Sequence, residues 1–380
     1  MFNIIILGIT SLLTDISSEM VYPLLPVYIV SVLGASPAIL GLIEGVAESS
    51  ASLLKVFSGY FSDKIKRRKP FAILGYFSST IGKFFLYIST GWGLVMFSRV
   101  IDRFGKGIRT APRDALIAES AKAGKKGAAF GLHRAMDSLG AAIGVALAYF
   151  LVTRYNGNLK NIFLISLIPA FLGVAFLFLV REKKAQPLPH SEKIKFNWHS
   201  LDKRLKLFLI FTFIFTLGNS SNQFLLLRAR NLGASLPTVI LLYLVYNLIY
   251  ALAAYPASRL SDRIGRKKLL VLGYLFYGLV YLGFARNSSL ANMWFLFGVY
   301  GLYISFTEGV EKALVADIAP SNLRATAIGL HATLVGIGLL PASILAGMLW
   351  NTFGPQAAFY FGAFMGLVAS IGFFFVLGGL

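Results

Sequence analysis

Long apolar stretches separated by short polar turns run along the whole chain. Each stretch can cross a hydrocarbon layer of about 30 Å as a helix, because one residue adds about 1.5 Å to an α-helix. The pattern predicts twelve spans, at 3–33, 37–61, 70–90, 92–118, 127–152, 161–181, 205–230, 236–258, 269–286, 290–314, 325–350 and 356–379. We therefore expect an all-α membrane protein with twelve transmembrane helices in two pseudo-symmetric six-helix bundles.

The composition supports the same class of protein. Of the 380 residues, 57% are hydrophobic and 14% are charged, and the mean hydropathy is +0.71. These values exclude an ordinary soluble domain. The opening residues, MFNIIILGIT, lack a basic start and a small-residue cleavage site, so they predict the first span and not a removable signal. Without cysteine, the chain has no disulfide, thiolate metal site or cysteine nucleophile.

The distribution of basic residues predicts the orientation in the membrane. Most Lys and Arg residues fall in the turns that follow even-numbered spans, and the alternate turns hold few. Because basic loops stay inside, we expect both termini in the cytoplasm and the chain in the cell (inner) membrane. The net charge of +20 then reflects topology and contact with anionic lipid head groups, and nucleic acid is not an expected partner.

The two halves of the chain repeat each other. Residues 115–133 align without gaps with residues 313–331, with eight of nineteen positions identical, and residues 59–69 match residues 258–268 at nearly the same offset. The longest polar stretch lies between the copies. We predict an N-terminal six-helix bundle at 1–181, a cytoplasmic linker at 182–204 and a C-terminal six-helix bundle at 205–380.

The repeated loop resembles a known family signature. GYFSDKIKRRK and SRLSDRIGRKK are similar to the loop G-x-x-x-D-R-x-G-R-R/K of the major facilitator superfamily, although Lys64 and Lys66 replace an arginine and a glycine in the first copy. Ser258 replaces the first glycine in the second copy. The opening SLLTDISSEMVYPLLPVY is similar to bacterial, drug-efflux-like branches. The resemblance implies a secondary transporter that works by alternating access, and it does not name the cargo.

We expect the repeated loops and the adjoining helix ends to form a cytoplasmic gate in which cations pair with acids. The residues assigned to this gate are Gly59, Asp63, Arg67, Arg68, Arg109, Arg113, Glu119, Asp262, Arg263, Arg266, Asp317 and Arg324. Gly59 would allow a close approach of two helices. In the alternative interpretation, the loop lysines only fix the topology.

A stripe of charge follows the fourth predicted span. The segment RVIDRFGKGIRTAPRD, residues 99–114, carries seven charged residues that share about 140° of a helix surface. Facing lipid, Asp102, Arg103 and Lys106 would together cost on the order of 8–10 kcal/mol. We therefore predict that the stripe faces the interior of the bundle. The part of it near the cytoplasmic end, which includes Arg109, fits structural ion pairs.

Arg103 is open to two interpretations, substrate contact and structural pairing. The run from Arg103 to Gly107 resembles a superfamily element whose arginine is implicated in proton coupling or substrate binding. A coupling carboxylate must be buried in one state and hydrated or paired in another. The acids at a suitable depth are Asp15, Glu19, Glu48 and Asp137, and we expect Arg103 to pair with one of them.

The candidates for substrate binding and proton coupling come from both halves. They are Asp15, Glu19, Glu48, Arg103, Arg134, Asp137, Asn222, Gln223, Tyr246 and Asn247. Asp137 begins a small-residue face with Gly140, Ala141, Gly144 and Ala148, which suits tight helix contact and partly matches the antiporter signature G-P-x-x-G-G. The tyrosines of the second half suit packing or an aromatic wall of the site.

The resulting prediction is proton-coupled export of a small amphiphilic organic solute by a monomer in the lipid bilayer. We expect no cofactor, because the proton gradient would supply the energy for transport. A divalent-metal exporter, an organic-anion uptake carrier and a channel remain alternatives. The motifs H-E-x-x-H, G-x-S-x-G and G-x-x-x-x-G-K are absent from the sequence, so we do not expect an enzyme. The residues do not define the charge of the solute.

Overall fold

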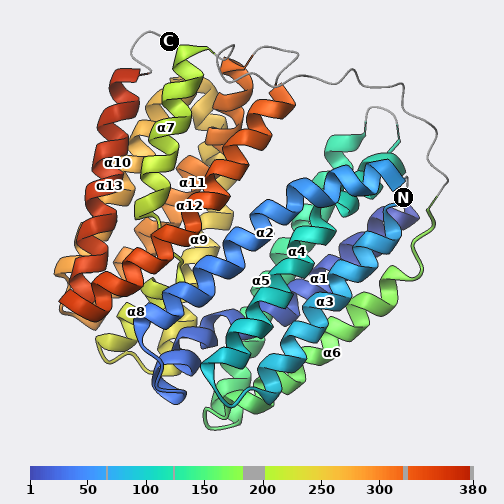
Figure 1. Cartoon of the computed structure of the whole chain (residues 1–380), viewed down its shortest axis with the longest axis horizontal. Coiled ribbons are helices and arrows are strands. Elements are labelled where there is room, and N and C mark those ends of the chain that lie inside the picture. Colours follow the sequence, from blue (N-terminus) through green and yellow to red (C-terminus); the bar gives the residue numbers. More distant parts are fainter. Residues whose placement is uncertain (66, 123–124, 183–201, 320–323, 377–380) are drawn as a thin grey trace. The chain divides into compact units, whose positions relative to one another are not determined.

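The computed structural model describes residues 1–65, 67–122, 125–182, 202–319 and 324–376 (Figure 1). These residues form helices and turns without a strand. The chain divides into two compact units. Unit 1 comprises Met1–Ala35, Val46–Gln186 and Ser235–Leu244, and unit 2 comprises Ser36–Gly45, Pro187–Ala234 and Val245–Leu380. Residues 183–201 of the predicted linker lie outside the described residues.

Unit 1 is built mainly from the first six predicted spans. Its helices are α1 (Phe2–Val21), α2 (Pro37–Ile65, from Val46 onward), α3 (Lys69–Ile88), α4 (Trp92–Ser120), α5 (Lys126–Arg154) and α6 (Leu159–Leu177). After α1 the first span continues as a 3₁₀ turn, Tyr22–Leu24, and a π-helical segment, Val27–Val32. Pro23 and Pro26 cause this change, since proline lacks the N–H that the α-helical ladder needs.

Glycines let the helices of unit 1 approach closely. A Cβ added to Gly75 of α3 would lie 2.6 Å from the carbonyl oxygen of Gly105 of α4. A Cβ on Gly144 of α5 would lie 2.6 Å from the carbonyl oxygen of Ile16 of α1. Both distances are too short for a side chain, so the backbones themselves are in contact. The predicted tight contact along the small-residue face of α5 is confirmed at Gly144.

Unit 2 holds most of the remaining helices. They are α7 (Lys203–Gly218), α8 (Gln223–Asn231), α9 (Leu236–Ile264, from Val245 onward), α10 (Arg266–Arg286), α11 (Leu290–Ile318), α12 (Arg324–Phe353) and α13 (Pro355–Val376). The polar residues 219–222 divide the predicted span 205–230 into α7 and α8. The hydroxyl of Tyr277 donates to the carbonyl of Gly218 at 2.7 Å, which satisfies one backbone group at the break.

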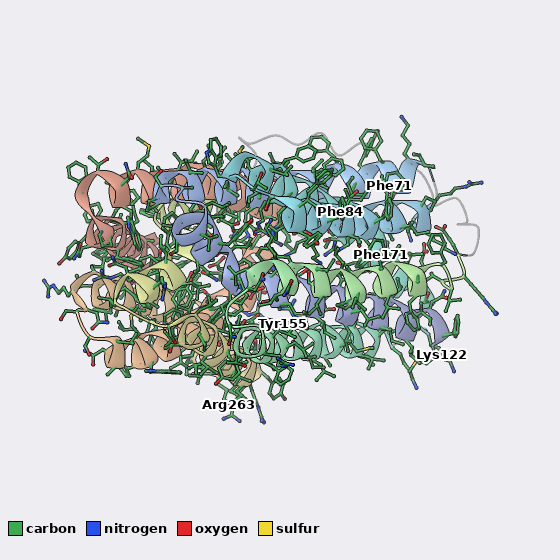
Figure 2. The ribbon with its side chains drawn as sticks, turned by 90° about the horizontal axis from the view of Figure 1, so that it is seen from below. Phe71, Phe84, Lys122, Tyr155, Phe171 and Arg263 are labelled. Carbon is green, nitrogen blue, oxygen red and sulfur yellow. The ribbon has the colours of Figure 1, made fainter. Side chains whose placement is uncertain are left out.

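Nine of the described helices are long and apolar enough to cross a membrane. The others are α7 and α8, which together occupy one predicted span, and α2 and α4, which carry acids and bases along their length. The twelve-span prediction is approximately consistent with this set. Large apolar side chains are exposed on the helices, including Phe84 of α3 and Phe171 of α6 (Figure 2). Such exposure is expected where lipid, and not water, surrounds the helices.

Candidate functional site

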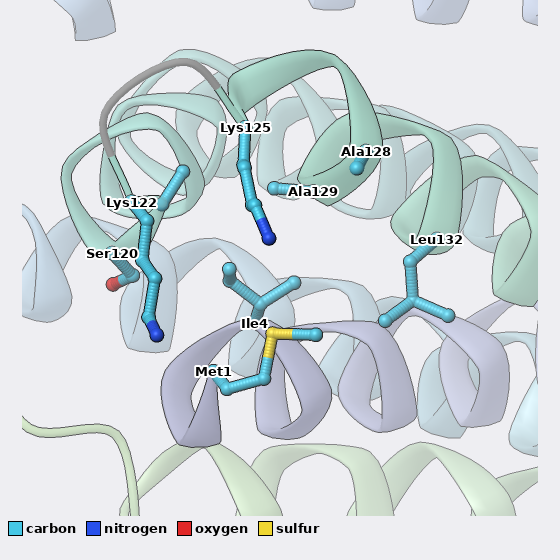
Figure 3. A pocket seen from close by; sticks show the side chains of 9 residues that line it. Met1, Ile4, Ser120, Lys122, Lys125, Ala128, Ala129 and Leu132 are labelled. Atoms are coloured by element: carbon cyan, nitrogen blue, oxygen red, sulfur yellow. The ribbon is translucent and has the colours of Figure 1, made fainter.

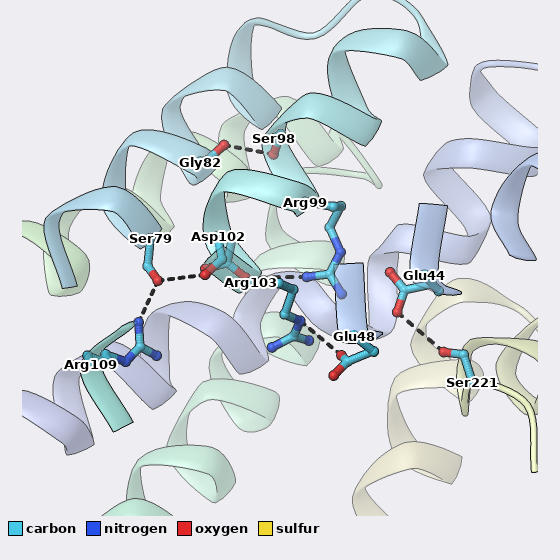
Figure 4. Close-up of polar contacts among 10 residues, drawn as sticks. All are labelled: Glu44, Glu48, Ser79, Gly82, Ser98, Arg99, Asp102, Arg103, Arg109 and Ser221. Atoms are coloured by element: carbon cyan, nitrogen blue, oxygen red, sulfur yellow. Dashed lines mark hydrogen bonds and ion pairs between the residues drawn. The ribbon is translucent and has the colours of Figure 1, made fainter. Parts of the chain in front are cut away.

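Four charged side chains of α4 are buried inside unit 1, and Figure 4 shows them with their polar partners. The exposed fraction is 5% for Arg99, 8% for Asp102, 8% for Arg103 and 6% for Arg109. Burial away from lipid is the arrangement that makes charge tolerable at this position. The prediction that the stripe faces the bundle interior is therefore confirmed for these four residues. Lys106, on the same helix, is exposed.

Arg103 is paired with α2. Its Nε lies 2.9 Å from Oε1 of Glu48, one of the four predicted partners (Figure 4). One turn earlier, Nη1 of Arg99 lies 3.4 Å from Oδ2 of Asp102 within α4. A charge-assisted pair of this kind compensates part of the cost of removing both groups from water. The two pairs place alternating charges through the middle of unit 1.

Arg109 of α4 contacts two residues of α3. Its guanidinium lies 4.5 Å from the ring centre of Tyr76, and Nη1 donates to the hydroxyl of Ser79. Ser79 in turn donates to the backbone carbonyl of Asp102 at 3.0 Å. These contacts join α3 to α4, so Arg109 stabilises the helix pair. Arg113 donates from Nη2 to Oδ1 of its neighbour Asp114 at 2.8 Å.

The acids of α1 lie beside this network. Asp15 and Glu19 are half-buried, and the hydroxyl of Tyr243, which also belongs to unit 1, donates to Oε2 of Glu19 at 2.7 Å. The positive charges of Lys106, Arg103 and Lys83 interact electrostatically with the carboxylate of Glu19. The charges of Asp137, Arg109 and Lys106 act on Asp15. Both predicted acids therefore belong to the electrostatic surroundings of the stripe.

Lys83 of α3 also belongs to this group of charged residues around α4, although the sequence patterns did not predict it. It is 4% exposed, and among the described residues its Nζ has no hydrogen-bond partner. Asp102 and Asp15 are the carboxylates whose charges act on it. The signal in the sequence is a single lysine within the apolar run TIGKFFLYI, where a charge is costly unless it has a role.

The remaining candidates of the first half lie on α5. Oδ2 of Asp137 is 3.3 Å from Nδ1 of His133, one turn earlier on the same helix, and His133 is buried. Arg134 is exposed. The histidine at the equivalent repeat position, His331 of α12, also faces an acid: its Nε2 lies 3.4 Å from Oε2 of Glu311. Each unit thus holds a buried histidine beside a carboxylate.

The candidates of the second half form a polar aromatic cluster in unit 2. The amide of Asn222 donates to the hydroxyl of Tyr246 at 3.3 Å, and the hydroxyl of Tyr300 donates to Oδ1 of Asn222 at 2.6 Å. The rings of Tyr246 and Tyr300 are 5.6 Å apart. The structure therefore brings two predicted residues together with Tyr300, which was not predicted. Gln223 is fully buried and Asn247 is half-buried.

The gate candidates form ion pairs inside each unit. Arg68 pairs with Glu119 in unit 1, and Arg266 pairs with Asp317 in unit 2, with Asp262 3.6 Å away on the preceding helix. Both pairs link the start of one helix to the end of the next, and their acids, Glu119 and Asp317, occupy equivalent positions of the repeat.

The other gate candidates make few such contacts. A Cβ on Gly59 would lie 3.3 Å from Cβ of Ala111, a close approach of α2 and α4. Arg67 and Arg263 are exposed. The side chains of Asp63 and Arg324 lie outside the described residues. A gating role for this set stays a prediction.

The sequence matches the family model of the Major Facilitator Superfamily over residues 7–226 and again over residues 207–378. The chain belongs to this superfamily. It is similar to an uncharacterised MFS-type transporter of Methanocaldococcus jannaschii, with 41% identity over 383 residues that cover 98% of this chain and 94% of the relative. It is also similar to the multidrug resistance protein MdtH of Blochmanniella pennsylvanica, with 23% identity over 343 residues that cover 87% and 81% of the two chains.

Solved structures of the superfamily share the fold. The nucleoside transporter NupG matches with a TM-score of 0.80 at 16% identity, covering 99% of both chains. A D-xylose–proton symporter matches with a TM-score of 0.73 at 19% identity, covering 98% of this chain and 97% of that one. The resemblance inferred from the repeated loops is confirmed, and the chain is a multi-pass membrane transporter of this superfamily.

Proposed function

We propose that this transporter exports a small amphiphilic organic solute in exchange for protons. The observation that carries the proposal is the ion pair between Arg103 and Glu48, set among further acids and bases in membrane-spanning helices. Apolar residues of similar size would often serve stability as well as a buried ion pair does. Since stability alone does not require the charges of Arg103 and Glu48, a role in transport is the better explanation for them.

The coupling step in this proposal is an exchange of partners. In this proposal, the positive charge of Arg103 favours the ionised form of the Glu48 carboxylate while the two groups are paired. When Arg103 turns to the solute or moves away with its helix, a carboxylate left in an apolar setting takes up a proton. Glu19, which Tyr243 holds at 2.7 Å, is a second acid suited to this role. The same motion would then link solute and proton.

The cluster of Asn222, Tyr246 and Tyr300 is proposed to contact the apolar body of the solute. Aromatic faces with a few fixed polar groups are typical of sites for organic ligands. The direction of transport is supported by the similarity to the multidrug resistance protein MdtH. We further propose that both termini lie in the cytoplasm and that the chain acts as a monomer in the cell membrane, without a cofactor.

Proteoliposomes with an imposed pH gradient test the proposal. Three probes share one ring system and differ in head charge: dansylglycine, dansylamide and dansyl-ethylenediamine. Saturable flux of at least one probe, driven by the gradient and stopped by a protonophore, is the expected result. Flux that ignores the gradient would remove the proton coupling. Absence of protein-dependent flux for all three would remove the solute class.

An organic-anion carrier is the second candidate, and Lys83 favours it. A buried ammonium without a hydrogen-bond partner among the described residues is suited to balancing the charge of an anionic head group. Flux restricted to dansylglycine and directed inward would favour this candidate over the exporter. Flux of the cationic probe would argue against it.

A further inference from the structure

One end of unit 1 contains a cavity of about 210 Å³. It lies between the start of α1, the end of α4 and the start of α5, and its lining includes Ile4, Ala128, Ala129 and Leu132 (Figure 3). Met1 lies at the same cavity. The lining is apolar where these helices face one another. Such a cavity at the end of membrane helices is shaped for a hydrocarbon chain and not for an ion alone.

Two lysines stand at this cavity. The side chains of Lys122 and Lys125 extend beside the apolar lining, and both are exposed (Figure 3). Among the described residues, neither ammonium has an ion-pair partner, and no acid lines the cavity. The site therefore combines two uncompensated positive charges with an apolar floor.

Two other basic cavities in the described part of the chain contain acids. The one lined by Arg67 and Lys69 in unit 1 also contains Glu182, whose carboxylate accepts from the backbone N–H groups of Arg68 and Lys69. The one at the start of α10 in unit 2 contains Asp202, Asp262 and Asp317. In both of these cavities acids compensate the bases, and the cavity of Lys122 and Lys125 differs from them in this respect.

The repeat shows that the two lysines are not a general feature of this loop. At the offset of 198 that aligns residues 115–133 with residues 313–331, Lys122 corresponds to Pro320 and Lys125 to Leu323. The second half keeps Ala319, Ala327 and His331 at the positions of Ala121, Ala129 and His133, and it lacks both charges. A requirement of the duplicated fold would be expected to appear in both halves.

We propose that this cavity binds an anionic phospholipid of the surrounding bilayer. Its phosphate pairs with Lys122 and Lys125, and the first part of an acyl chain lies on the floor formed by Ile4, Ala129 and Leu132. Lysines at the membrane surface attract anionic head groups, while the apolar floor accepts the chain. The bound lipid joins α1 to the turn between α4 and α5.

The test measures thermal unfolding of the purified full chain in detergent, with dioleoyl phosphatidylglycerol or dioleoyl phosphatidylcholine added. Both lipids carry the same chains, and inorganic phosphate is a third addition. A ligand of the folded state raises the midpoint with concentration. We expect phosphatidylglycerol to act at much lower concentration than phosphatidylcholine, and phosphate to be without effect. Each lysine near the membrane surface contributes a similar share of the binding free energy for an anionic head group. The variant Lys122→Gln/Lys125→Gln loses two such contributions, so it should weaken the phosphatidylglycerol effect by about thirtyfold.

The matched control is Lys267→Gln/Lys268→Gln, which removes the same charge in unit 2 and should keep the wild-type response. Leu132→Trp fills the cavity while keeping both lysines, and it should also reduce the response. Native mass spectrometry gives a second measurement on whichever variants remain folded: one fewer retained phosphatidylglycerol is expected. An unchanged response in the Lys122/Lys125 variant, an equal loss in the control, or a full response to inorganic phosphate would overturn the proposal.

Discussion

Nε of Arg103 lies 2.9 Å from Oε1 of Glu48, so a base of α4 and an acid of α2 form an ion pair inside unit 1. Asp102, the residue before Arg103, faces Arg99 on the other side at 3.4 Å. Arg103 therefore lies next to the Arg99–Asp102 pair of α4 and itself pairs with an acid of another helix. This position is suited to exchanging one partner for another.

Removing Arg103 should stop coupled transport while the protein stays folded. In Arg103→Ala we expect gradient-driven flux to fall by about tenfold or more, because the partner exchange is lost. Arg103→Lys should recover part of the flux, since it restores charge without the planar fork. Proteoliposome flux across a pH gradient measures both. Arg154→Ala, at the exposed end of α5, is the control. If Arg103→Ala shows wild-type flux and pH dependence, the charged stripe has a structural role only and the coupling proposal is wrong.

Replacing Lys83 should stabilise the protein. Its ammonium is buried without a hydrogen-bond partner among the described residues, so Lys83→Met should raise the free energy of unfolding by about 1–3 kcal/mol. The same change at Lys69 should have the opposite sign, because its Nζ donates to the carbonyls of Phe178 and Val180, both at 2.7 Å. Unfolding titrations in mixed micelles measure both values. Destabilisation by Lys83→Met would show that the lysine is well compensated.

The glycines of α5 should differ sharply in their tolerance of a side chain. Gly144→Ala should cost about 1–3 kcal/mol of stability, because the added Cβ would meet the backbone of α1. Gly131, on the same helix, has nothing within 4 Å of an added Cβ. Gly131→Ala should therefore be neutral or stabilise by about 0.5–1 kcal/mol. Thermal unfolding of the two variants provides the comparison, and equal effects would contradict the contact of α1 with α5.

The membrane orientation can be checked with single cysteines, because the chain has none of its own. Lys64 and Asn156 are both exposed, at opposite ends of predicted spans. In intact cells an impermeant thiol reagent should label Asn156→Cys and spare Lys64→Cys, whereas inverted vesicles should give the reverse. Labelling of Lys64→Cys from outside would overturn the predicted topology.

The sequence by itself determined the elements and the direction in which charge faces. Span positions follow from the length of apolar stretches, and the predicted starts at 37, 92, 236 and 290 coincide with those of α2, α4, α9 and α11. The burial of Arg99 and Asp102 could also be predicted, since charge facing lipid is costly in any fold. Such properties depend on one helix and its solvent.

Only the tertiary structure decided which residues meet. Asp15, Glu19, Glu48 and Asp137 were equally suitable partners for Arg103 by depth, and the packing of α2 against α4 placed Glu48 there. Tyr300 joins Asn222 from a helix 78 residues away. Periodicity gives the face and the depth of a side chain, whereas pairing depends on the rotation and separation of two helices. Those quantities are fixed by all the contacts of the bundle together, so no single stretch of sequence contains them.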